Sequence, residues 1–148
     1  EETGALLAGE MSGHIFFKER WYGFDDGLYT AARLLEIVAK SKKDVSDVFA
    51  ELPNSINTPE LKLSIAEDKK FAFIQAFQAH VDFPDAKLTK IDGVRAEFSD
   101  GWGLVRASNT SPYLILRFEA DNLPALKRIQ TLFGNALLAM DPHLKLPF

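Results

Sequence analysis

The sequence contains no cysteine, no long apolar segment and no excess of basic residues. With no cysteine among 148 residues, a disulfide framework is excluded, and the composition is typical of a protein from the reducing cytoplasm. No apolar run approaches the roughly 20 residues needed to cross a bilayer, so we expect no membrane partner. The formal net charge is −4. Because no basic stripe is available to displace counterions, we expect no nucleic-acid partner either.

The N-terminus also lacks an initiator methionine and a secretory signal pattern. The chain begins Glu1-Glu2-Thr3, and we therefore expect it to be a piece of a longer protein. What the sequence does contain is a hydrophobic fraction of 47%, which is enough for a packed core. Its length suits one ordinary domain or two small ones.

The first third of the chain predicts a strand pair followed by helices. Short apolar runs at residues 5–8 and 15–17 indicate two strands or strand pieces with a polar loop between them. Asp25 and Asp26 precede an apolar stripe at helical spacing, so capping and the helix dipole favour a helix over residues 27–39.

A shorter helix and a polar segment follow. Apolar residues at helical spacing over residues 45–52 predict a second helix, which Pro53 stops. Residues 54–59 are polar and bounded by prolines, which is the composition of a linker or hinge.

Beyond residue 59, alternating apolar and polar residues indicate half-buried strands. Asp92-Gly93 predicts a two-residue hairpin, and Ser99-Asp100-Gly101 predicts another turn. Asp121 or Asn122 is expected to cap a final helix. The element order is β-α-β-β-β-β-α, which predicts an α+β fold with an antiparallel sheet and two helices on one face.

The connection between the last two predicted strands carries unusual chemistry. It reads Arg106-Ala107-Ser108-Asn109-Thr110-Ser111-Pro112 and offers a guanidinium fork, hydroxyls, an amide and backbone N–H groups. These donors suit phosphate oxygens. The same residue types also form ordinary polar turns with the arginine in a surface ion pair, so spacing alone leaves both interpretations open.

A second polar loop lies between the first two predicted strands. Glu10 and Ser12 could grip sugar hydroxyls, and the flanking glycines would permit close backbone approach. His14 could act as a general acid or base near neutral pH, or bind a phosphate or hydroxyl. The alternative is a solvated glycine turn. Helix capping explains Asp25 and Asp26 better than metal binding does, so we expect no metal site in this chain.

Three motifs carry a resemblance to a known family. Gly-Glu-Met-Ser-Gly-His at residues 9–14, Phe16-Phe17-Lys18-Glu19-Arg20-Trp21 and Gly23-Phe24-Asp25-Asp26-Gly27 resemble the α-D-phosphohexomutase superfamily, in its bacterial phosphomannomutase/phosphoglucomutase branch. Residues 106–112 resemble that family's phosphate-binding loop, in the right order and separation. The resemblance implies the end of an α/β third domain at residues 1–55. It also implies a whole fourth domain at residues 56–148, with a fold similar to TATA-box-binding protein.

The resemblance also implies roles for individual residues. Glu10 and Ser12 would bind hydroxyls shared by glucose and mannose, and His14 would approach the ligand and assist proton transfer. The phosphate that is not reacting would be held by four residues of the second loop, namely Arg106, Ser108, Asn109 and Thr110.

The implied activity is that of an isomerase. It would interconvert the 1- and 6-phosphates of glucose and mannose through a bisphosphate intermediate, with Mg²⁺ as the parent enzyme's cofactor. The family's Ser-His-Asn-Pro-type phosphoserine loop and its Asp-Gly-Asp-Gly-Asp-Arg-type metal loop do not occur in this sequence. We therefore expect a fragment that needs its missing N-terminal domains as partners and is inactive alone. The alternative is a stand-alone, non-catalytic phosphosugar-binding module.

Overall fold

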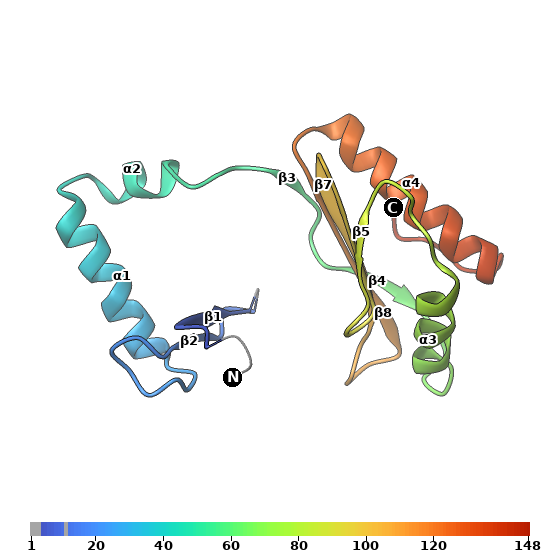
Figure 1. Cartoon of the computed structure of the whole chain (residues 1–148), viewed down its shortest axis with the longest axis horizontal. Coiled ribbons are helices and arrows are strands. Elements are labelled where there is room, and N and C mark those ends of the chain that lie inside the picture. Colours follow the sequence, from blue (N-terminus) through green and yellow to red (C-terminus); the bar gives the residue numbers. More distant parts are fainter. Residues whose placement is uncertain (1–3, 11) are drawn as a thin grey trace. The chain divides into compact units, whose positions relative to one another are not determined.

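The computed structural model of the chain describes residues 4–10 and 12–148. Met11, which belongs to the first motif, and the N-terminal residues 1–3 lie outside the described residues. The chain divides into two compact units, Glu1–Pro53 and Asn54–Phe148 (Figure 1). Within the described ranges, no helix combines the length and the apolar character that a membrane crossing requires.

The first unit pairs a β-hairpin with two helices. Strands β1 (Leu7–Gly9) and β2 (Ile15–Phe17) are antiparallel, and helices α1 (Gly27–Ser41) and α2 (Val45–Ala50) follow. Helix α1 begins where expected because the Asp26 side chain accepts a hydrogen bond of 2.9 Å from the backbone N–H of Tyr29. The Tyr29 ring stacks on Trp21 with ring centroids 4.3 Å apart. This stacking holds the helix start against the segment after β2.

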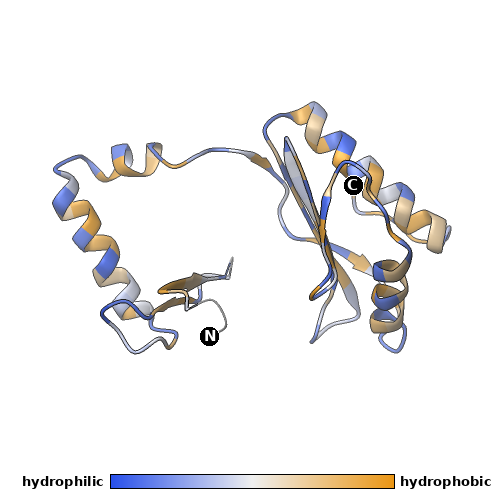
Figure 2. Ribbon diagram, in the orientation of Figure 1, coloured by the Kyte–Doolittle hydropathy of each residue, from blue (hydrophilic) through white to orange (hydrophobic). Residues whose placement is uncertain are grey.

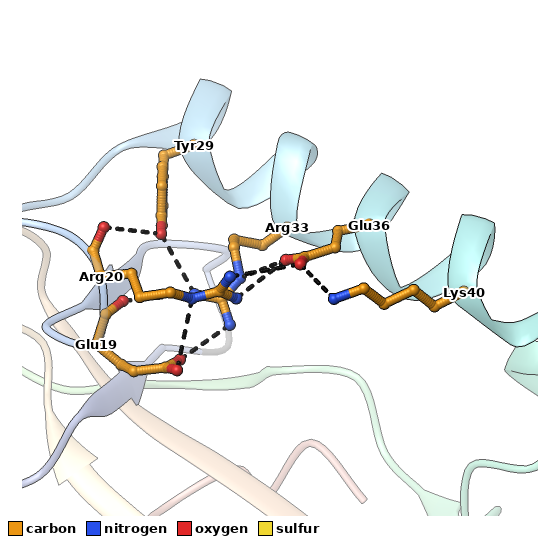
Figure 3. A network of polar contacts seen from close by, with 6 residues as sticks. All are labelled: Glu19, Arg20, Tyr29, Arg33, Glu36 and Lys40. Atoms are coloured by element: carbon orange, nitrogen blue, oxygen red, sulfur yellow. Dashed lines mark hydrogen bonds and ion pairs between the residues drawn. The ribbon is translucent and has the colours of Figure 1, made fainter.

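A polar network joins that segment to the next turns of α1 (Figure 3). Arg33 donates to Glu19 at 3.0 Å, and Arg20 donates to Glu36 at 3.0 Å. The hydrogen bond from Arg20, aided by a second from Lys40, lowers the pKa of Glu36 to about 2. The side chains of Glu19, Arg20 and Lys40 are 49%, 54% and 73% exposed. Since exposed ion pairs are weak, we expect their contacts to orient the segment more than they stabilise it.

The described residues of the first unit form no hydrophobic core of their own. None of the residues described between 4 and 53 is buried. Helix α1 leaves Leu28 87% exposed and Leu35 67% exposed, and Figure 2 shows apolar residues along its length. A unit that buries so little apolar surface gains little of the free energy that stabilises an isolated domain.

The second unit is an antiparallel sheet with two helices on one side (Figure 1). The sheet order is β3-β8-β7-β6-β5, and β4 also pairs with β8. This arrangement confirms the predicted α+β class and the β-α-β-β-β-β-α order after residue 60. The elements are β3 (Ile56–Asn57), β4 (Leu61–Ser64), α3 (Lys70–His80), β5 (Lys87–Thr89), β6 (Val94–Phe98), β7 (Gly101–Ala107), β8 (Tyr113–Ala120) and α4 (Leu123–Met140).

The core of this unit lies between the sheet and helices α3 and α4. Phe118 of β8 meets Phe133 of α4 edge to face, with ring centroids 5.4 Å apart, and both side chains are fully buried. A Cβ atom on Gly103 would lie 2.5 Å from the Phe133 ring. The absence of a side chain at Gly103 therefore lets α4 press directly on the sheet.

The predicted linker over residues 54–59 is wrong in its second half. Ile56 and Asn57 form β3 and pair with the end of β8. Thr58 is buried and exchanges hydrogen bonds with Phe118, donating its N–H at 2.9 Å and accepting from the Phe118 N–H at 3.1 Å. The polar composition of residues 54–59 predicted a hinge. It did not reveal the strand, because the partner residue Phe118 lies 60 positions further along the chain.

The predicted two-residue hairpin at Asp92-Gly93 is also wrong. Strand β5 ends at Thr89 and β6 begins at Val94, so residues 90–93 form a wider loop. Gln78 of α3 donates to the carbonyl oxygens of Lys90 at 3.2 Å and Gly93 at 2.9 Å. A side chain from a distant helix thus holds the loop open.

We predict that residues 54–148 fold as an isolated polypeptide, because every strand of the second sheet finds its partners within this segment. A ¹H–¹⁵N correlation spectrum of the isolated segment should be well dispersed. Residues 1–53, which lack buried side chains among those described, are the matched control and should give a collapsed spectrum. Poor dispersion for residues 54–148 would contradict the prediction.

Candidate functional site

The loop between β1 and β2 is a tight connection closed by its own backbone. The Glu10 N–H donates to the His14 carbonyl at 2.9 Å, and the Gly13 N–H donates to the Glu10 carbonyl at 3.0 Å. Gly13 has φ of +92°, a conformation that favours glycine. The hairpin therefore presents the exposed side chains of Glu10, Ser12 and His14 from a backbone that is already closed.

Glu10 and Ser12 act together in this loop. The Ser12 hydroxyl donates to Glu10 Oε2 at 3.1 Å, so one carboxylate oxygen has a fixed partner in the loop itself. An ionised carboxylate accepts hydrogen bonds at both oxygens. The pair therefore offers an oriented acceptor, which suits hydroxyl groups.

His14 is paired with Asp25, which the sequence interpretation assigned to helix capping. The His14 Nδ1 lies 2.6 Å from Asp25 Oδ2, and the backbone N–H of Ile15 donates to Asp25 Oδ1 at 3.3 Å. The hydrogen bond and the charge of Asp25 raise the pKa of His14, and nearby Glu10 raises it further. Capping is correct for Asp26. Two adjacent carboxylates precede α1, and one side chain is enough to cap a helix. That surplus was the signal in the sequence that Asp25 has another role.

The β7–β8 connection places the second group of candidate residues. The backbone N–H of Ser108 donates to the Tyr113 carbonyl at 3.0 Å, and the Thr110 N–H donates to the Ser108 hydroxyl at 3.4 Å. Ser108 is 8% exposed, whereas Asn109 and Thr110 are exposed. The loop thus combines an anchored serine with two accessible polar residues.

Arg106 stands on the sheet face opposite the helices. Its neighbours Val105 and Ala107 are buried, so strand alternation turns the Arg106 side chain to the open face. Its Nη1 lies 3.8 Å from Asp92 Oδ2, and the Asp92 side chain is 73% exposed. Because exposed ion pairs are weak, an incoming anion can replace this partner at little cost.

A cleft of about 250 Å³ lies beside Arg106, lined by residues of the β5–β6 loop and by Arg95. Gly93 shapes this edge. Its φ is +107°, and a Cβ atom there would lie 2.2 Å from the Val105 carbonyl oxygen. The loop can therefore approach the Arg106 backbone only with glycine at this position.

The structure thus brings the candidate residues together in two separate groups. Glu10, Ser12 and His14 lie in the first unit, and residues 106–110 lie in the second. Among residues 4–10 and 12–148, no three His, Asp or Glu side chains converge as ligands for a metal ion. The described residues therefore offer no site for the Mg²⁺ that the resemblance assigns to the parent enzyme.

Two models of protein families match the two parts of the chain. Residues 1–56 match phosphoglucomutase/phosphomannomutase, alpha/beta/alpha domain III, and residues 60–134 match the phosphoglucomutase/phosphomannomutase C-terminal domain. The chain belongs to this family. The resemblance to the phosphohexomutases is thereby confirmed, including its bacterial phosphomannomutase/phosphoglucomutase branch.

Individual relatives agree. The chain is 56% identical over 148 residues to a phosphomannomutase/phosphoglucomutase of Pseudomonas putida, covering 100% of this chain and 32% of the relative. It is 54% identical over 149 residues to a phosphoglucomutase of Neisseria gonorrhoeae, with 99% and 32% covered. The chain therefore spans about a third of the length of these curated relatives.

A solved structure shows the same fold. A crystal structure of a phosphoglucomutase/phosphomannomutase family protein from Burkholderia thailandensis is 53% identical, with a TM-score of 0.88. The match covers 99% of this chain and 31% of that chain.

We predict that Asp25→Asn lowers the pKa of His14, because Asp25 provides the two largest effects that raise it. Asparagine keeps an oxygen for the Ile15 N–H, so the hairpin should remain. In the unaltered protein His14 stays protonated to higher pH than an ordinary histidine. Its pairing with Asp25 therefore stabilises the fold below about pH 6.5 and is lost as the pH rises through the raised pKa.

The measurement is an NMR titration of the His14 ring protons in both proteins. The backbone spectrum controls for folding. An unchanged midpoint in Asp25→Asn would contradict the assigned role of Asp25.

Proposed function

We propose that this chain is the recognition part of a phosphohexomutase that interconverts hexose 1-phosphates and hexose 6-phosphates of glucose and mannose. Residues 1–55 would form the end of its third domain and residues 56–148 its fourth domain. The observation that carries the proposal is that two short loops with complementary chemistry coincide with the family's motifs. One loop offers an oriented carboxylate, and the other offers a guanidinium beside hydroxyl and amide donors.

The second loop is the proposed phosphate clamp. The Arg106 fork would exchange its contact with Asp92, at 3.8 Å, for two phosphate oxygens. Ser108, Asn109 and Thr110 would donate to the remaining oxygens. Because Ser108 is anchored by the Tyr113 carbonyl, part of the ordering cost is met before the ligand arrives.

The first loop is the proposed sugar grip. Glu10 would accept hydrogen bonds from neighbouring hydroxyls while Ser12 keeps the carboxylate oriented at 3.1 Å. His14, whose pKa is raised by its hydrogen bond to Asp25 and by the charge of that carboxylate, would donate to the ligand and assist proton transfer at a sugar oxygen. Glucose and mannose share most of these hydroxyls, which is why both sugars are proposed as substrates.

We further propose that the chemistry at the transferred phosphate belongs to the remaining domains of the parent enzyme. There, a phosphoserine would donate its phosphoryl group to give a bisphosphate, the intermediate would reorient, and the other phosphate would return to the serine. Those domains would also hold the Mg²⁺ site, which would supply charge neutralisation at the transferred phosphoryl group. We place this enzyme in the cytoplasm because the sequence has no cysteine.

A second candidate function is a stand-alone phosphosugar-binding module. The observation that favours it is that the second unit carries its own core and its own anchored loop. Both candidate functions predict that the chain alone binds sugar phosphates without turnover. Only the enzyme part would give activity when it is combined with the remaining domains of the parent enzyme.

We predict that Arg106→Ala weakens the binding of glucose 1-phosphate and glucose 6-phosphate by similar factors. A clamp on the phosphate that is not reacting must serve both orientations of one intermediate. Loss of a charge-assisted contact should weaken binding about tenfold or more. Calorimetric or NMR titration of both ligands gives the measurement.

Arg128→Ala is the matched control. Arg128 pairs with Asp100 at the opposite end of β7, so the variant loses the same charge away from the clamp and should bind as the unaltered chain does. An unchanged dissociation constant for either sugar phosphate in Arg106→Ala would overturn the proposed clamp.

We also predict that this chain alone does not isomerise glucose 1-phosphate, even with Mg²⁺ and glucose 1,6-bisphosphate. Holding a sugar and a remote phosphate does not lower the barrier at the transferred phosphorus, which needs an aligned phosphodonor and a neutralising cation. An assay coupled to glucose-6-phosphate dehydrogenase tests this. Turnover that co-purifies with the chain and is lost in the Glu10→Ala variant would contradict the prediction, because the chain would then be a complete catalyst.

A further inference from the structure

Lys70, at the start of α3, is a buried cation that neither loop motif contains. Its side chain is 0% exposed, and it is the largest of the fully buried side chains in the described part of the molecule. The Nζ donates to the Ser111 carbonyl at 3.1 Å and lies 2.6 Å from Glu67 Oε1. Ser111 belongs to the loop of residues 106–112, 41 positions away in the sequence.

The fold by itself gives no reason for a cation at this position. Removing an ammonium from water is costly, even when it is paired. A positive charge in the first turn of a helix also opposes the helix dipole. An apolar side chain would serve the packing of α3 better. The Nζ also forms an ion pair with the exposed Glu67 and lies 5.1 Å from the centroid of the Phe71 ring, but both of these partners are close neighbours in the sequence. The contact that reaches a distant segment is the one with the Ser111 carbonyl.

That contact controls a loop oxygen that would otherwise repel an anion. The Ser111 carbonyl also accepts a hydrogen bond of 2.8 Å from the backbone N–H of Tyr113. Held between an ammonium and an amide, this oxygen cannot turn toward a phosphate. A second hydrogen bond holds the next residue of the loop: the Ile65 N–H donates to the Pro112 carbonyl at 3.1 Å.

We infer that Lys70 is a positioning residue of the phosphate clamp, one that holds the C-terminal half of the loop so that Ser108, Asn109 and Thr110 present their donors to the anion. The inference rests on the proposed function of this loop. Lys70 does not touch the phosphate. It acts through the Ser111 carbonyl, and its effect is on affinity rather than on the choice of sugar.

The test is Lys70→Met in the full chain, titrated with glucose 1-phosphate. Methionine fills a similar volume, and Glu67 is left in solvent because its side chain is already 62% exposed. No buried carboxylate is therefore orphaned. We expect binding to weaken about fivefold to tenfold, with NMR shift changes that include the amides of residues 108–111. Lys70→Arg, which keeps a cationic donor, should restore part of the affinity.

Lys69→Met is the matched control, since Lys69 is the exposed neighbour of Lys70 and its loss changes the net charge equally. It should bind as the unaltered chain does. In the unaltered chain itself, the ¹⁵Nζ resonance of Lys70 should shift on saturation with glucose 1-phosphate. This measurement needs no variant and remains decisive if Lys70→Met does not fold.

The outcomes separate the inference from the function on which it rests. If Arg106→Ala weakens binding while Lys70→Met binds like Lys69→Met, the positioning role is wrong and the clamp stands. If Arg106→Ala has no effect, the proposed clamp itself is wrong. A Lys70 Nζ resonance that does not respond to the ligand would likewise overturn the positioning role.

Discussion

The antiparallel pairing of β7 with β8 is the constraint on which the second unit depends. Its register runs from Gly101 opposite Ala120 to Ala107 opposite Leu114, and a shift of one residue would turn every side chain to the other face. In the observed register, Phe118 lies under helix α4 while Arg106 faces away from the helices. One pairing therefore buries the core and places Arg106, the arginine of the proposed clamp, on the open face.

The two units differ in how their loops are held. The proposed phosphate loop, residues 106–112, rests on a sheet with a buried core. Lys70 of α3 and Ile65, the residue after β4, each add a hydrogen bond to it. The proposed sugar loop, between β1 and β2, belongs to a unit in which none of the described residues is buried. Its shape comes from its own backbone bonds and from the His14–Asp25 pair. Local contacts therefore hold the β1–β2 loop, whereas contacts with segments distant in the sequence hold the β7–β8 loop.

Each of three basic side chains in or beside the candidate sites has a carboxylate partner. Arg106 faces Asp92, Lys70 meets Glu67 and His14 binds Asp25. The side chains of these carboxylates are 73%, 62% and 44% exposed. Water can therefore solvate each carboxylate when its basic partner moves away or binds an anion. This arrangement explains how a chain with a net charge of −4 can offer local positive charge.

Local sequence patterns were enough to predict the element order after residue 60, the α+β class, a helix cap at the Asp25–Asp26 pair and the family. These features follow from local patterns of apolar spacing, turn residues and short motifs. Only the tertiary structure decided the strand at Ile56–Asn57, the wide loop held by Gln78, the pairing of Asp25 with His14 and the burial of Lys70. Each of these features depends on a partner that lies at least 11 positions away in the sequence, and the partner of Ile56 is Ala120. Such a partner leaves no periodic trace in the local sequence, because folding alone brings the two segments together.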